Sequence, residues 1–97
     1  MRRIRNTSLT IDTTNTPVSP ALYGNKRMVL ILSNTSIAGE KISIAVGSEA
    51  VLGQGIVLNQ NDKMTLTSDG TYLPSVEQIN AIATVNTATL SVYEETE

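Results

Sequence analysis

Cysteine, histidine, tryptophan and phenylalanine are all missing from this chain of 97 residues. Without cysteine the chain can form no disulfide, zinc-thiolate site or thiol nucleophile, and its redox compartment is left open. Without histidine it lacks the usual general base and the commonest metal ligand. Three tyrosines are the only aromatic residues, so stacking platforms for sugars or bases are scarce. We therefore expect no enzymatic activity, no metal and no cofactor.

Charge and long apolar runs are also scarce. Only 16% of the residues are charged and the formal net charge is −2, so no basic field attracts nucleic acid or an anionic membrane. No run approaches the roughly 18 apolar residues of a membrane span. The basic start "MRRIRNTSLTID" lacks the apolar segment of a secretory signal. These features predict a soluble protein made in the cytosol, with neither nucleic acid nor membrane as a partner.

What the chain does contain is a composition typical of β-strands. It has thirteen threonines and nine serines, and valine and isoleucine are frequent. Apolar and polar residues alternate over 41–46 and 88–94, which predicts strands with one buried face. Seven or eight strands are expected, at Arg3–Ile11, Arg27–Ser33, Lys41–Val46, Ala50–Leu52, Gly55–Leu58, Lys63–Thr67, Asn80–Val85 and Ala88–Glu94.

Short turn sequences separate these strands, so residues 1–97 are expected to form one all-β domain, a small antiparallel β-sandwich of jelly-roll or Ig-like type with a short basic N-terminal arm. Pro17 and Pro20 predict a long loop over 13–24. In 73–79 the spacing of Ser75 and Gln78 allows one capped helical turn. The glycines of "GQG" at 53–55 are expected to supply a positive φ or a bulge.

The run "MVLIL" at 28–32 is apolar on both faces of its strand, so the face away from the core also needs a cover. Either the 13–24 loop or a neighbouring subunit supplies that cover. The pattern leaves open which alternate set faces inward. The candidate interface residues are Met28, Val29, Leu30, Ile31 and Leu32.

The two ends of the chain carry opposite charges, with Arg2, Arg3 and Arg5 at the start and Glu94, Glu95 and Glu97 at the end. If the first and last strands pair antiparallel, these charges meet across the ladder. Alternatively they are solvated, frayed ends, or the basic arm docks on an acidic surface of a larger assembly. The three arginines are therefore further interface candidates.

We expect structural roles for the aspartates and the tyrosines. Asp12, Asp62 and Asp69 lie in or beside expected turns, where carboxylates cap backbone amides, although a cation held at Asp69 is an alternative. Tyr93 should point outward from its strand. Tyr23 and Tyr72 lie in expected loops and are expected mainly to pack.

Residues 42–95 carry a loose pattern of glycines and alternating strands: Val46-Gly47, then Gly55 to Leu58, the polar turn and strand "NQNDKMTLT", "AIA" at 81–83 and "LSV" at 90–92. In this pattern the chain resembles small β-sandwich proteins of bacteriophage particles, of the head decoration or fibre-base type. In such proteins the stretch 53–67 would be a hairpin that closes the sandwich.

The resemblance implies a structural virion protein: a capsid decoration or cement protein, or a head-fibre-base module. It would bind the major capsid protein or other virion proteins as a homo-oligomer, often a trimer, and would reside in the virion. The alternative from another class is a glycan- or host-surface-binding module that uses Tyr23, Tyr72 and the loop asparagines.

Overall fold

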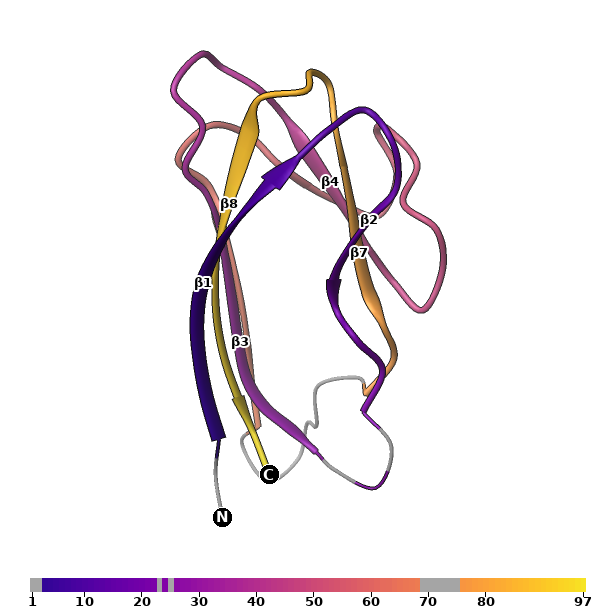
Figure 1. Cartoon of the computed structure of the whole chain (residues 1–97), viewed down its shortest axis with the longest axis vertical. Coiled ribbons are helices and arrows are strands. Elements are labelled where there is room, and N and C mark those ends of the chain that lie inside the picture. The colour runs from indigo at the N-terminus through magenta and orange to yellow at the C-terminus, as the bar shows by residue number, and fades with distance from the viewer. Residues whose placement is uncertain (1–2, 23, 25, 69–75) are drawn as a thin grey trace.

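The computed structural model describes residues 3–22, 24, 26–68 and 76–97, and the regular structure within them is entirely β (Figure 1). Threonine and β-branched residues favour strands throughout this part of the chain. The eight strands are β1 (Arg3–Ile11), β2 (Thr16–Ser19), β3 (Arg27–Asn34), β4 (Ile42–Val46), β5 (Ile56–Leu58), β6 (Lys63–Thr67), β7 (Ile79–Ala83) and β8 (Ala88–Thr96).

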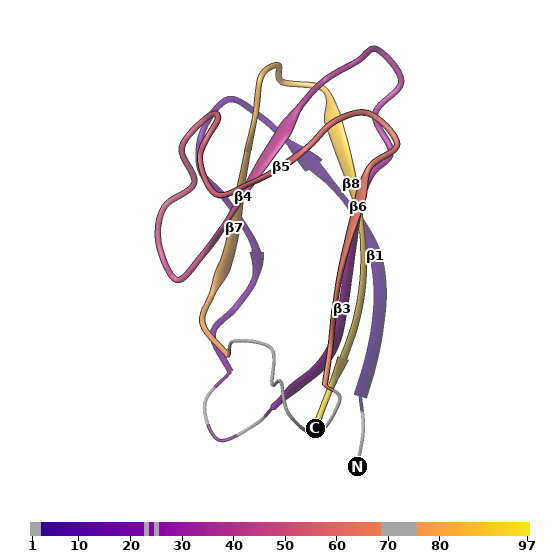
Figure 2. The ribbon, with the colours of Figure 1, turned by 180° about the vertical axis from the view of Figure 1, so that it is seen from behind.

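The strands form two four-stranded antiparallel sheets that face each other (Figures 1 and 2). Sheet A has the order β1-β8-β3-β6 and sheet B the order β2-β7-β4-β5. The pairing is nested, because β1 pairs with β8, β2 with β7, β3 with β6 and β4 with β5. This winding is that of an eight-stranded jelly roll. The expected β-sandwich is thus confirmed, and of its two named types the jelly roll is the one observed.

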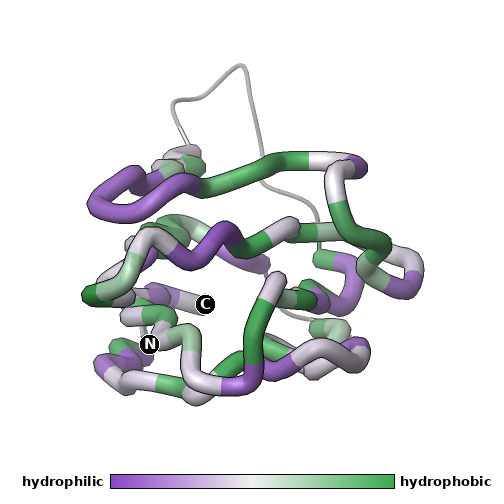
Figure 3. The backbone as a smooth tube through the Cα atoms, turned by 90° about the horizontal axis from the view of Figure 1, so that it is seen from above, coloured by the Kyte–Doolittle hydropathy of each residue, from purple (hydrophilic) through white to green (hydrophobic). Residues whose placement is uncertain are grey.

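The hydrophobic core lies between the sheets and is built by alternation along each strand. Leu30, Leu32 and Leu90 from sheet A pack towards Ile42 and Ile44 from sheet B. Each fully buried side chain of this size contributes about 1.5–3 kcal/mol. The alanines of β7 are also fully buried in the core. Seen from above in Figure 3, the tube passes repeatedly between hydrophobic and hydrophilic colour, as expected when each strand turns one face inward.

Seven of the observed strands lie within two residues of the predicted bounds, and two predictions were wrong. The segment expected as a loop contains β2, which includes Pro17. Because β2 pairs only with β7 at the edge of sheet B, a residue without an amide proton is tolerated there. The expected strand at 50–52 is instead part of a loop, since Gln54 N donates to Val51 O at 3.0 Å in a turn.

Two further expectations concern connections. Residues 53–67 do not form a hairpin, because β5 belongs to sheet B and β6 to sheet A, so the turn at 59–62 crosses from one sheet to the other. Asn61 in that turn adopts a φ of 68°, which asparagine tolerates better than most residues. Of the expected helical turn at 73–79, residues 73–75 lie outside the described residues, and 76–78 are not helical.

Candidate association surfaces

The outer face of sheet A is an open surface with an apolar centre. Strand register places Val29 between Glu95 and Thr67, and Ile31 between Tyr93 and Thr65. Both side chains are half-buried by these neighbours alone. Figures 1 and 2 show no described segment outside this sheet. We call the surface around these two residues the open face.

The open face answers the question that the two-faced strand at 28–32 raised. Leu30 and Leu32 are fully buried in the core, so Val29 and Ile31 form the outward set. The segment 13–24 does not cover them, because its strand β2 lies in sheet B. Met28 stands at a register shift between Arg27 and Val29 and is half-buried. Of the five candidates in this run, two therefore belong to the core and two to the open face.

The outer face of sheet B, in contrast, is covered by the loop 47–55. Ser43 and Asn80 point outward between core residues, yet they are only 2% and 5% exposed. Gly53 N donates to Ser43 Oγ at 3.0 Å, and Asn80 Nδ2 donates to Ser48 O at 2.7 Å. The loop thus supplies backbone partners for the polar side chains that it buries.

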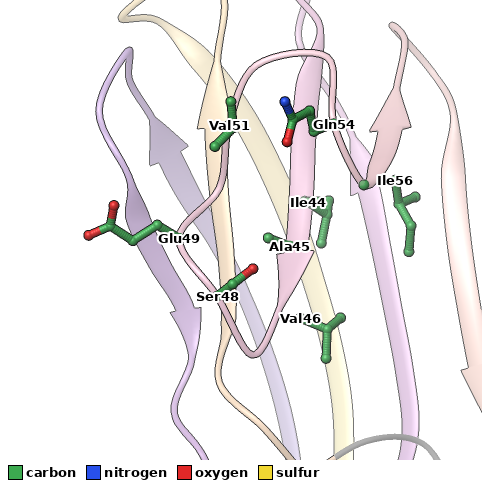
Figure 4. A pocket seen from close by; sticks show the side chains of 9 residues that line it. Ile44, Ala45, Val46, Ser48, Glu49, Val51, Gln54 and Ile56 are labelled. Carbon is green, nitrogen blue, oxygen red and sulfur yellow. The ribbon is translucent and has the colours of Figure 1, made fainter.

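A groove of about 340 Å³ lies between this loop and strands β4 and β5 (Figure 4). Its walls include Val46, Val51 and Ile56, which are each between a third and a half exposed. Ser48, Glu49 and Gln54 of the loop also line it, and the Glu49 side chain extends away from the loop in Figure 4. The groove is therefore apolar within and polar at its rim.

Gly55 makes the return of the loop possible. It has a φ of 76°, and a Cβ at this position would lie 2.4 Å from Ile44 O. Gly53 has nearly the same φ of 78°, but a Cβ there would meet nothing within 4 Å. The expectation that these two glycines supply positive φ is confirmed, and only at Gly55 does close packing also require glycine.

One pair of opposite charges from the two chain ends, Arg5 and Glu94, meets in a cluster in which Glu94 is buried and Arg5 is 40% exposed. As expected for antiparallel pairing of the first and last strands, Arg5 lies opposite Glu94. The Arg5 guanidinium lies 3.5 Å from Glu94 Oε1 and donates to Val18 O at 3.0 Å. Arg3 is exposed within β1, and Arg2 lies outside the described residues. Arg5 is therefore committed to the fold rather than displayed on an arm.

Arg27, which the sequence reasoning missed, is the main partner of Glu94. It is fully buried, and its Nε donates to Glu94 Oε2 at 2.7 Å. Its second partner is Ser19 of sheet B, which lies 2.9 Å from Arg27 Nη2 and itself donates to Glu94 Oε2 at 2.8 Å. A signal was present, because Glu94 continues the inward phase of Leu90 and Val92, and a buried carboxylate requires a cation or donors. The cluster joins the two sheets at one end.

At the other end of the sandwich, the uncharged side chain of Asn34 also joins the two sheets. Its Nδ2 donates to Glu40 O at 2.8 Å and to Leu58 O at 2.9 Å, and its Oδ1 accepts from Ser36 N at 3.1 Å. The side chain is 1% exposed. Asn34 begins the tripeptide Asn-Thr-Ser, an acceptor pattern for N-glycosylation, and its burial closes this pattern to modification in the folded chain.

The remaining candidates keep structural roles where they are described. Asp12 Oδ1 accepts from the Thr14 hydroxyl at 2.6 Å and from Thr14 N at 2.8 Å, and the hydroxyl bond is the main cause of the lowered pKa of Asp12. Asp62 Oδ2 accepts from Asn59 N at 3.0 Å. Both turn roles are confirmed. Tyr93 points outward, as expected, and donates to Glu95 Oε2. Asp69, Tyr23 and Tyr72 lie outside the described residues.

Neither a metal-binding group nor a membrane-spanning helix occurs in the part of the chain that the structure describes. Within it, no three histidine, cysteine, aspartate or glutamate residues are grouped to hold a metal ion. None of its segments forms a helix long and apolar enough to cross a membrane. A comparison with models of protein families gives no match, and neither does a comparison with curated proteins.

Proposed function

We propose that this chain is a non-catalytic structural subunit of a virus particle, a capsid decoration or head-fibre-base module that binds the capsid lattice as a homo-oligomer. The jelly roll supports the proposal as an analogy, because this architecture recurs in viral capsid domains, although it also occurs in lectins and cupins. Since one fold hosts many functions, the surface of this chain supports the proposal more specifically than its fold does.

The open face is the observation that carries the proposal. Its centre is formed by Val29 and Ile31, and their neighbours in register are Thr65, Thr67, Tyr93 and Glu95. Glu95 is the one charged residue among these four neighbours, so contact here desolvates little charge, as is typical of the centre of protein interfaces. Its β-branched side chains also lose little rotamer freedom on contact. A flat, stiff and weakly charged sheet face suits adhesion to another protein.

Attachment to a particle also suits a small domain for a physical reason. A capsid presents the same site many times, so an oligomer that reaches several sites gains avidity without stronger individual contacts. Modest surfaces such as the open face would therefore suffice if several copies bind together. The virion assignment itself rests on the resemblance described for residues 42–95.

The test is the double variant Val29→Thr with Ile31→Thr. Threonine keeps the branched shape and strand preference, so we expect the free energy of unfolding to change by less than about 1.5 kcal/mol. Co-sedimentation with capsids should weaken at least tenfold. Val85→Thr is the matched control, because it makes the same change at another exposed valine, remote from the open face in sequence and outside sheet A.

The proposal fails if the wild-type chain stays monomeric by light scattering and does not sediment with capsids. It also fails if the double variant binds capsids as the wild type does. Binding to a glycan array in the absence of capsid binding would favour the adhesion alternative.

A further inference from the structure

Ile37 is exposed to solvent on a loop that hydrogen bonds fix before and after it. Its side chain is 92% exposed, the largest value among the exposed large hydrophobic residues that the structure describes. The flanking residues Ser36 and Glu40 are buried. Ser36 Oγ accepts from Thr89 N at 3.0 Å, and Glu40 O accepts from Asn34 Nδ2 at 2.8 Å. The loop 35–41 thus presents one large apolar side chain from a fixed backbone.

The groove beside the loop 47–55 is a concave site that could accept an exposed apolar side chain such as Ile37. Its walls are apolar, and its volume of about 340 Å³ is at the low end of the roughly 300–1,000 Å³ of ligand sites. Figures 1 and 2 show the loops 35–41 and 47–55 on opposite sides of the sandwich. Ile37 therefore cannot fill the groove of its own chain.

We propose that Ile37 of one copy inserts into the groove of a second copy. A few side chains buried in pockets supply most of the binding energy of an interface, and an aliphatic anchor in an apolar pocket can be one of them. Charge complementarity supports this occupant, because exposed Lys41 ends the loop that carries Ile37, and exposed Glu49 stands at the rim of the groove with its side chain extending outward (Figure 4). This inference rests on the proposed homo-oligomer and specifies the contact between its copies.

The geometry of the contact has a consequence for symmetry. The inserted residue and the groove are different surfaces of the same chain, so the contact is heterologous, or head-to-tail. Such contacts produce a closed ring when the rotation between copies closes. A trimer or another cyclic ring is expected, and a two-fold dimer is not.

Cysteine cross-linking tests the contact directly, because the natural chain has no cysteine. Ala38→Cys places a thiol beside Ile37, and Ser48→Cys places one at the groove. When the two single variants are mixed under mild oxidation, we expect a disulfide-linked pair in at least tenfold excess over the control mixture. That control combines Ala38→Cys with Ser8→Cys, which lies on the exposed side of β1. A yield equal to the control overturns the inference.

Complementation gives a second, independent readout. Ile37→Asp removes the inserted side chain, and Val51→Asp spoils the groove; each should reduce self-association at least tenfold and leave the circular dichroism spectrum unchanged. A mixture of the two retains one intact contact, between Ile37 of the second variant and the groove of the first. Light scattering should therefore find a heterodimer that grows no further.

The two proposals can fail separately. If Ile37→Asp self-associates like the wild type, the inference is overturned while capsid binding through the open face stands. If the wild type self-associates through this contact but never binds capsids, the inference stands and the virion function is overturned. A wild-type chain that is monomeric and gives no cross-link overturns the inference.

Discussion

The outer faces of the two sheets differ in whether another segment of the described chain covers them. On sheet B the outward residues include polar Ser43 and Asn80 beside apolar Ala45 and Ile82, and the loop 47–55 supplies backbone partners for the two polar side chains. On sheet A the outward residues Val29 and Ile31 are apolar, and no described segment lies over them. A buried polar group on an outer face indicates an intramolecular cover, because its hydrogen bonds must be satisfied within the fold. An apolar centre without a cover is instead open to contact with another molecule.

The largest expected effect concerns the cluster that ties the two sheets together. Glu94→Gln removes the negative charge beside Arg27, which has no exposure to solvent. We expect the free energy of unfolding to fall by about 3 kcal/mol, the lower end of the range for breaking a buried ion pair, because the amide still accepts one hydrogen bond. Urea unfolding measures the effect, with exposed Lys63→Gln as the control. A loss below about 1 kcal/mol would show that this cluster is not what joins the sheets.

The next effect tests how the loop that covers sheet B is built. Gly55→Ala combines a strained positive φ with a clash against Ile44 O, so we expect a loss of roughly 2–3 kcal/mol. Gly53→Ala has the same backbone strain without the clash, and a loss of about 1 kcal/mol is expected. The difference between the two unfolding free energies isolates the close approach of the loop to β4. Equal losses would contradict it.

A smaller effect is expected when one serine from each sheet is replaced by alanine and the losses in free energy of unfolding are compared. Ser43→Ala removes the acceptor for Gly53 N, and we expect a loss of about 1 kcal/mol. Ser33→Ala makes the same change on the outer side of β3, where a change within about 0.5 kcal/mol is expected. Both are measured by urea unfolding at low protein concentration. The contrast between the sheets would be wrong if Ser33→Ala were the more damaging substitution.

The smallest effect is a pH dependence at the connection between β1 and β2. The hydrogen bond from the Thr14 hydroxyl lowers the pKa of Asp12 below its ordinary value of 3.8 in the folded chain. The resulting stabilisation is present above pH 3.8 and is lost as the pH falls through the folded pKa. Asp12→Asn should therefore lose less stability than the wild type on acidification through this window. Superimposable curves of urea midpoint against pH would exclude this contribution.

Much of the sandwich could be predicted from local pattern. The bounds of β1 and β6 coincide with those expected, since alternation and β-branched content are properties of the segment itself. β2 could not be predicted, because whether Pro17 is tolerated depends on its being at a sheet edge. Arg27 was missed for a related reason, since the register shift that turns it inward beside Glu94 exists only once β3 pairs with β8.

Of the candidate association surfaces, one was indicated by the sequence and the other could be found only in the folded structure. The run at 28–32 indicated that its strand is apolar on both faces. The groove has no recognisable sequence motif, because residues 47–55 form it by folding back over β4.

Alternation and β-branched content along the chain are enough to establish short strands with one buried face, and one strand with a surplus of apolar surface. Only the tertiary structure decided that the strands wind as a jelly roll, which alternate set of β3 enters the core, and which outer face the chain covers itself. The physical reason is that strand formation depends on neighbouring residues, whereas strand pairing and surface coverage depend on contacts between residues far apart in the chain.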